Sequence, residues 1–204
     1  MSFQPFVNQI SSLQNDSILS WKKNNNGSAF INKELAANPF LTLVAENHSF
    51  NYQLWHAEDR ARREDMGFEY VYHAKREIDY CNQQRNNRME SMDNWLFSTL
   101  KPASHLDCPV NSETPGMMID RLSILALKAY HMKQQTERKD VDETHRQTCL
   151  QKLLVIEEQQ AQLQACLVKL LDEIKDKTRT FRVYHQFKMY NDPNLNPELY
   201  EARG

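Results

Sequence analysis

The sequence predicts an all-α protein: a bundle of about four long helices, with an N-terminal helical arm and an irregular aromatic C-terminal tail. Two observations predict it. The 204 residues include four glycines, and long stretches contain no proline, so the residues that punctuate strands and turns are scarce. Apolar residues recur at helical spacing, and no segment alternates as a half-buried strand does. We expect an arm over residues 1–28 and a single bundle domain over residues 29–204.

Composition narrows the class of protein. Hydrophobic residues make up 40% and charged residues 25% of the chain, as in ordinary globular domains. A net charge of −2 and a pI near 6.4 give no electrostatic bias toward nucleic acid. No run approaches the roughly 20 apolar residues of a membrane span, and the four cysteines form no CxxC pair. These features favour a soluble, cytoplasmic protein.

The first element is an amphipathic helix over residues 3–21. Phe6, Val7, Ile10 and Leu13 recur at helical spacing, and the polar stretch KKNNNGS that follows is typical of a linker. We expect this arm to pack on the bundle or on a second subunit. Binding to a membrane surface is a weaker alternative, because the only cations of the arm lie at its end.

Two long helices come next, over residues 40–65 and from Gly67 to about Phe97. Asn38 is a suitable N-cap for the first, with Pro39 at the first helical position. Gly67 indicates a bend or break between them. The segment KPASHLDCPVNSE then predicts a loop.

Thr114 and Pro115 predict the start of a third helix, PGMMIDRLSILALKAYHM, which is apolar nearly all round its axis. Such a helix belongs in the middle of a bundle. A fourth helix, from about Asp142 to Lys177, is expected to be either an antiparallel hairpin partner or a dimerising coiled coil. One side of it is expected to carry Leu150, Leu153, Leu154, Glu157, Ala161, Gln164, Leu167, Leu171 and Ile174.

Polar residues lie unusually close to the predicted core. On the second long helix they share an arc of about 100° that borders the apolar face, and the first and third helices also carry charges on apolar faces. Buried charges are costly unless paired. We therefore expect an internal polar site walled by three helices. A purely structural network, or a solvated stripe on residues such as Asp79 and Asn82, is the alternative.

The side chains available there suit a polar, anionic ligand, because Arg and Lys bind phosphate or carboxylate while amides bind hydroxyl groups. Candidate acid and base groups are Glu58, Asp79, Asp120 and His131. Candidate ligand-binding residues are Trp55, Asp59, Arg62, Lys75, Arg76, Asn82, Gln83, Arg85, Asn86, Glu90, Arg121, Lys128 and Lys188.

Metal binding is disfavoured, because a di-metal carboxylate bundle needs ExxH on two helices and the sequence has none. A Mg²⁺ held by carboxylates and a phosphate stays open. No cofactor motif such as GxGxxG or a P-loop is present. We predict no cofactor, and whether the protein is an enzyme stays undecided.

Several blocks resemble a bacterial family, domain-of-unknown-function family 4254: NYQLWHAEDRAR, AKREIDYCNQQRNNRMESMD, SETPGMMIDRLSILALKAYHM and YHQFKMYNDPNLNPELY. The likeness covers about Leu41 to Tyr200. The resemblance implies a link to glycosyltransferases and to cell-surface glycan synthesis of the lipopolysaccharide type, with no established activity. The candidate residues above, and Asn51 and Asp93, match positions at which family members resemble one another.

Two functions follow as hypotheses. The protein binds or acts on an anionic sugar derivative, such as a nucleotide sugar or sugar phosphate, in the internal polar site. Alternatively it is a non-catalytic scaffold or partner of a glycosyltransferase, which would use the apolar arm and the long fourth helix for docking. A homodimer through long helices is compatible with either. The aromatic tail is expected to fold back over the bundle, where it either closes one end of the polar site or simply packs.

Overall fold

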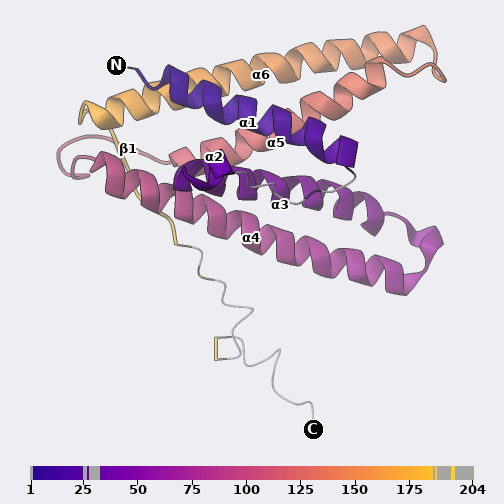
Figure 1. The fold of residues 1–204 in the computed structure, drawn as a ribbon, viewed down its shortest axis with the longest axis horizontal. Coiled ribbons are helices and arrows are strands. Elements are labelled where there is room, and N and C mark those ends of the chain that lie inside the picture. Colours follow the sequence, from indigo (N-terminus) through magenta and orange to yellow (C-terminus); the bar gives the residue numbers. More distant parts are fainter. Residues whose placement is uncertain (1, 25–26, 28–32, 186, 188–193, 196–204) are drawn as a thin grey trace.

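The computed structural model describes residues 2–24, 27, 33–185, 187 and 194–195. Long helices make up most of this part of the chain, so the predicted all-α class is confirmed (Figure 1). The helices are α1 (Gln4–Asn24), α2 (Lys33–Ala36), α3 (Pro39–Ala61), the 3-10 turn η1 (Glu64–Met66), α4 (Phe68–Leu100), α5 (Pro115–Thr136) and α6 (Glu143–Lys175). Two short strands, β1 (Val110–Asn111) and β2 (Thr180–Phe181), complete it.

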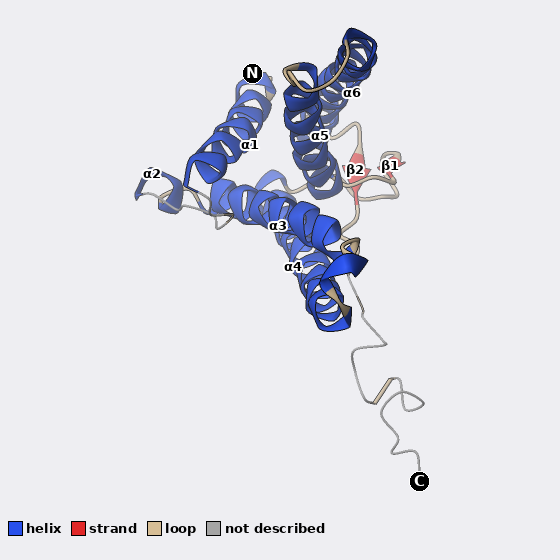
Figure 2. Ribbon diagram, turned by 90° about the vertical axis from the view of Figure 1, so that its right-hand side faces the viewer, coloured by secondary structure: helices blue, strands red, loops and turns tan. Residues whose placement is uncertain are grey.

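The long helices form two antiparallel hairpins, α3 with α4 and α5 with α6, and α1 packs against α3, α5 and α6. Figure 2 shows the two hairpins set at an angle to each other. The α5 helix contacts each of the other four long helices, so its predicted place in the middle of the bundle is confirmed. Its apolar side chains Ile119, Leu122 and Leu127 are almost fully buried.

Local sequence signals start and stop these helices as expected. The Asn38 side chain accepts a hydrogen bond from the Leu41 backbone N–H at 3.1 Å, and Thr114 accepts one from Met117 at 3.2 Å. A proline follows each cap, in the first turn of the helix. Gly67 breaks the path between α3 and α4, since its φ of 88° lies where side chains are rarely tolerated.

The α4 and α5 helices approach closely at Gly116. Its N–H donates to a carboxylate oxygen of the buried Asp93 at 2.7 Å. A Cβ at position 116 would lie 2.6 Å from the backbone oxygen of Met89 and 2.8 Å from Asp93 Oδ1. Asp93 thus accepts a donor at the N-terminus of α5, where the helix dipole favours a negative charge.

The N-terminal helix contributes to the core. Val7 and Ile10 are fully buried in the main hydrophobic cluster, and Ile18 and Trp21 are almost fully buried. Packing on the bundle was one of the two locations predicted for this segment, and it is the one observed.

The prediction for the side of α6 that meets the bundle is wrong for several residues. Leu153, Leu167, Leu171 and Ile174 are buried, whereas Leu150, Leu154, Glu157 and Ala161 are exposed. The predicted stripe was too wide, because it combined the buried face of the helix with an apolar strip on the outside. Leu154 is 51% exposed and Val155 is 52% exposed on that outer side.

The segment after α6 is anchored by a two-residue parallel pairing, Val110 with Thr180 and Asn111 with Phe181. Phe181 is fully buried, so the first aromatic side chain of the tail packs as expected, while Tyr184 and Phe187 are exposed. Lys188 and Tyr190 lie outside the described residues, as does any contact of theirs with the bundle. In the described part of the chain, no helix has the length and apolarity needed to cross a membrane.

Candidate functional site

A buried carboxylate joins three helices below the surface. Asp120 of α5 is 2% exposed, and Arg85 of α4 donates to its two oxygens at 3.2 and 2.6 Å. Asn47 and Asn51, one turn apart on α3, donate to Asp120 Oδ1 at 3.0 and 2.9 Å. The carboxylate therefore has a charged partner and two amide donors, which compensate for its removal from water.

The same network continues to α1 through a serine and a histidine. His48 Nε2 lies 2.8 Å from the backbone oxygen of Gln14, and Nδ1 lies 2.6 Å from the Ser123 hydroxyl. A carbonyl only accepts, so Nε2 must carry the proton and Nδ1 must accept from Ser123. Burial lowers the pKa of His48 to about 3, so the ring is neutral at ordinary pH.

This internal network is sealed. Its members Asn47, His48, Asn51, Asp120 and Ser123 are all between 0 and 3% exposed. None of them lines the three cavities described below. The Ser123–His48 pair resembles a nucleophile and its base, but neither side chain is exposed in the described part of the chain. The network holds α1, α3, α4 and α5 together, which is the structural alternative considered from the sequence.

Three predicted site residues lie on the outside of α4. Lys75 is 62% exposed and Asp79 46% exposed, and they form an ion pair one turn apart at 3.2 Å, with Arg76 also 3.6 Å from Asp79. The prediction that these charges face an internal site is wrong. A polar arc of about 100° that borders the core also borders solvent. The packing of the neighbouring helices decides whether a residue of this arc is buried or exposed.

The rest of the α4 stripe is half-buried. Asn82, Gln83 and Asn86 are partly covered, and Gln83 donates to Asn87 on the same helix at 3.0 Å. Glu90 lies 2.7 Å from the His185 ring at the start of the tail. None of these residues contacts Asp120 in the hydrogen bonds of the described chain.

Trp55 and His131 meet at another place, where their rings stack with centroids 4.6 Å apart and planes 4° from parallel. The His131 Nε2 atom is buried and makes no hydrogen bond to a described residue, and burial lowers the pKa of the ring.

Asp59 lines a separate cavity of about 420 Å³ with His56. Glu58 pairs with the exposed Arg62 one turn away at 3.1 Å.

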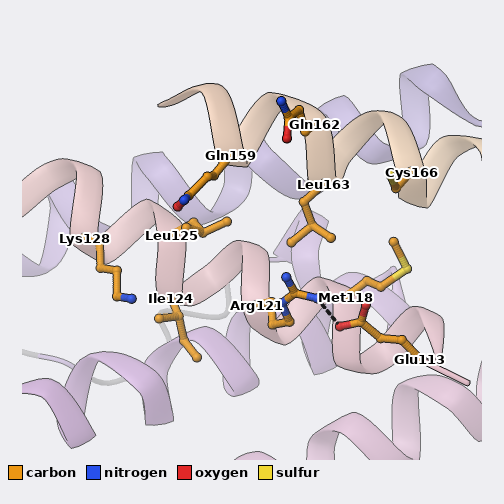
Figure 3. A pocket seen from close by; sticks show the side chains of 10 residues that line it. All are labelled: Glu113, Met118, Arg121, Ile124, Leu125, Lys128, Gln159, Gln162, Leu163 and Cys166. Atoms are coloured by element: carbon orange, nitrogen blue, oxygen red, sulfur yellow. Dashed lines mark hydrogen bonds and ion pairs between the residues drawn. The ribbon is translucent and has the colours of Figure 1, made fainter. Parts of the chain in front are cut away.

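A groove between α5 and α6 brings together the predicted residues Arg121 and Lys128 (Figure 3). Its volume is about 620 Å³. Arg121 and Lys128 lie two turns apart on α5, and Gln159 of α6 points toward α5, whereas Gln162, which also lines the groove, donates to Glu158 of its own helix at 3.2 Å. The remaining lining residues are Glu113, Met118, Ile124, Leu125, Leu163 and Cys166.

The groove is polar at its edges and partly apolar between them. Arg121 Nη1 lies 2.5 Å from Glu113 Oε1, so the carboxylate orients the guanidinium while its other N–H groups stay available. The exposed ammonium of Lys128 makes no ion pair with a carboxylate of the described chain. Such a combination binds phosphate or carboxylate through the cations and hydroxyl groups through the amides.

Sequence reasoning missed half of this groove. Gln159, Gln162 and Cys166 lie on α6, where no local pattern separates the flank that meets α5 from the flank that meets water. It also missed Asn47 and Ser123 of the sealed network. The sequence did contain a signal for Asn47, because Asn47 and Asn51 lie four residues apart and so on the same face of an apolar helix. In the described part of the chain, no three His, Cys, Asp or Glu side chains are grouped as a metal site would need.

The sequence was compared with known proteins. Comparison with the curated proteins and with the solved structures gives no match. A family model described as "Protein of unknown function (DUF4254)" matches residues 41–183, a range that runs from the first turn of α3 past β2. That range contains both the sealed network around Asp120 and the groove between α5 and α6, and the chain belongs to the DUF4254 family.

Proposed function

We propose that the protein binds an anionic sugar derivative, a sugar phosphate or nucleotide sugar, in the groove between α5 and α6. The observation that carries this proposal is that two cations of one helix and two amides of the neighbouring helix line the same groove. A volume of about 620 Å³ lies within the usual range of small-molecule sites. The earlier expectation of an internal site is thereby replaced by a site on the surface.

Each wall of the groove has its own part in recognition. Arg121, oriented by Glu113, presents its free guanidinium N–H groups to a phosphate, and Lys128 adds a second positive charge. Gln159 and Gln162 carry donors and acceptors that match sugar hydroxyl groups. Ile124, Leu125 and Leu163 supply the apolar surface against which a sugar ring packs.

The ligand class also agrees with the biological context that the family resemblance implies, the synthesis of cell-surface glycans of the lipopolysaccharide type. A protein with this role would bind a glycosyl donor or a phosphorylated precursor in the cytoplasm. Binding is the function proposed here, and Glu58, Asp79 and His131 are not assigned to a reaction.

Lys128→Glu tests the proposal against Lys133→Glu, a matched charge reversal on an exposed lysine of the same helix outside the groove. A panel of hexose phosphates and nucleoside diphosphate hexoses is titrated into each protein by calorimetry. We expect at least one ligand to bind the natural protein, and Lys128→Glu to weaken it about tenfold or more, since a charge-assisted contact contributes about 1.5–3 kcal/mol. Lys133→Glu should retain affinity.

Two outcomes would count against the groove. The first is that no member of the panel binds the natural protein at millimolar concentration. The second is that both charge reversals weaken binding equally, which would indicate a nonspecific effect of net charge.

A second candidate is a scaffold that docks to a glycosyltransferase. The apolar side chains on the outer side of α6 favour it, because Leu150, Leu154 and Val155 are exposed next to one another. Contiguous exposed apolar residues commonly indicate a protein contact. In this case Leu154→Glu should abolish co-purification with a glycosyltransferase of the same gene cluster, while Lys128→Glu should leave it intact. Co-purification that survives Leu154→Glu would exclude this surface.

A further inference from the structure

The groove between α5 and α6 continues past Arg121 into a second cavity of about 320 Å³. The two cavities adjoin, because Glu113, Met118 and Cys166 line both. The second is completed by Asn111, Lys169, Leu170, Glu173 and Arg179. Together they follow α6 from Gln159 to Glu173, about 21 Å of helix at 1.5 Å per residue.

The second cavity is built by the parallel pairing of β1 with β2. Asn111 pairs with Phe181 in register, which places the loop before α5 beside the segment after α6. Phe181 is fully buried and anchors this segment, so the neighbouring Arg179 is held over the end of α6. Residues about 70 positions apart in the chain thus form one wall, as a fixed part of the fold.

The two cavities each carry an arginine, a lysine and a glutamate. In the first, Glu113 orients Arg121 and Lys128 lies nearby. In the second, Glu173 lies 2.8 Å from Arg179 Nε and 3.8 Å from the Nζ of Lys169, whose side chain is 77% exposed. Each arginine keeps N–H groups that its carboxylate partner does not use. The continuous groove therefore holds four cations and two carboxylates, an excess of positive charge along its length.

We propose that the ligand of this groove is a nucleoside diphosphate sugar that spans both cavities, rather than a sugar monophosphate confined to the first. This inference rests on the proposed function and names its substrate class. The glycosyl portion packs against Gln159 and Gln162, and the diphosphate contacts cations from both cavities. Lys169 and Arg179 line only the second cavity, so a hexose phosphate held within the first cavity does not contact them.

The discriminating variant is Lys169→Glu, since this lysine lines the second cavity and is exposed enough to be replaced without loss of folding. Lys152→Glu is its control, because Lys152 is an exposed lysine of α6 that lines neither cavity. Calorimetric titrations use one nucleoside diphosphate hexose and the corresponding hexose 1-phosphate. We expect Lys169→Glu to weaken the diphosphate ligand about tenfold or more, to leave the monophosphate within about twofold, and Lys152→Glu to change neither.

The outcomes separate the two proposals. If Lys169→Glu weakens both ligands equally, or neither, the ligand does not extend into the second cavity and this inference falls while the first proposal stands. If neither ligand binds the natural protein, both fall. Arg179→Gln gives an independent reading of the same cavity, and retained affinity for the diphosphate ligand in this variant would likewise contradict the inference.

Cys166 tests directly whether a ligand occupies the junction between the two cavities, called the join below. It is exposed and lines both cavities, whereas Cys81 and Cys149 are buried. In a Cys108→Ser background, the rate of maleimide labelling reports on Cys166. A saturating nucleoside diphosphate hexose should slow labelling severalfold, and more than the hexose phosphate does. Labelling at an unchanged rate in the presence of the diphosphate ligand would show that the join is empty.

Discussion

Asp120 shows how much a single buried charge depends on its partners. Its carboxylate accepts from Arg85, Asn47 and Asn51, and the Asn51 amide also lies 2.9 Å from the Ser123 hydroxyl oxygen. The sequence suggested a catalytic carboxylate at this position. In the structure Asp120 is 2% exposed and accepts from residues of two other helices, so it joins α3, α4 and α5.

Replacing Asp120 by Ala should therefore destabilise the protein strongly. The variant leaves the buried end of the Arg85 side chain without its carboxylate and removes the acceptor that Asn47 and Asn51 share, and breaking a buried pair costs roughly 3–5 kcal/mol. We expect about 3 kcal/mol, since Arg85 keeps some contact with water. Urea unfolding followed by circular dichroism measures it.

The matched control is Asp79→Ala, which removes a carboxylate that is 46% exposed on α4. Exposed ion pairs contribute little, so the change should stay within about 0.5 kcal/mol. Equal losses in the two variants would mean that Asp120 is not the centre of a buried network.

At the scale of the helices, the contact between α4 and α5 depends on one small residue. Gly116 lies in the first turn of α5, and its missing side chain lets that turn rest on the Met89 backbone and on the Asp93 carboxylate. The same contact gives the N-terminal N–H groups of α5 an acceptor from another helix. Two helices are thereby joined by a hydrogen bond and by close approach.

Gly116→Ala should reverse the usual sign of a Gly-to-Ala change in a helix. At an unhindered helical position this substitution stabilises by about 0.5–1 kcal/mol. Here the added methyl group would lie 2.6 Å from Met89 O, so overpacking should cost about 1–3 kcal/mol instead. The free energy of unfolding from chemical denaturation decides the sign.

Ser98→Ala, on an exposed position near the end of α4, is expected to change little. A stabilised Gly116→Ala variant would contradict the close packing described here.

Across the whole molecule, two buried groups oppose each other in their response to pH. Burial raises the pKa of Asp93 to about 6 from an ordinary value of 3.8, and burial lowers the pKa of His48 to about 3 from 6.5. Between about pH 4 and 6 the native state binds an extra proton at Asp93, while the unfolded state binds an extra proton at His48. The two contributions to the pH dependence of stability therefore largely cancel in this window.

Asp93→Asn should expose the contribution of His48. The raised pKa of Asp93 stabilises the native state below about pH 4, and this stabilisation is lost as pH rises through 6. The Asp93→Asn variant has no carboxyl group at this position and therefore lacks this contribution. Relative to the variant, the natural protein should gain roughly 2–3 kcal/mol as pH falls from 6.5 to 4. Unfolding free energies at several pH values, measured for both proteins, test this. A constant difference between them would mean that Asp93 does not titrate in this range.

Most of the fold could be predicted, because helix boundaries depend on neighbours in sequence. Asn38, Gly67 and Thr114 act through their own backbone conformations and the next few N–H groups, so their roles were visible without tertiary contacts. The apolar character of α5 likewise predicted its central place. The role of a residue that acts on the nearest turn of its own helix can therefore be predicted from the sequence.

The candidate site was predicted only in part, because a site is made by residues on different helices. Arg121 and Lys128 were identified by type and spacing, but Gln159 and Gln162 line the same groove only because α6 packs back on α5. Lys75 and Asp79 share the polar arc of Asn82, yet they are exposed, although Ala74 and Ile78 beside them are buried. Angular position on a helix does not say which edge of a polar arc a neighbouring helix covers.

By itself, the sequence determined the helical class, the start of each main helix, the central position of α5 and the family of the chain, since these follow from local propensity, periodicity and residue identity. Tertiary structure alone decided which polar residues are sealed and which meet water. The crossing of the two hairpins buries Asp120 with Arg85, and the packing of α6 leaves a groove beside Arg121. Burial depends on contacts between distant segments, and no helical period contains that information.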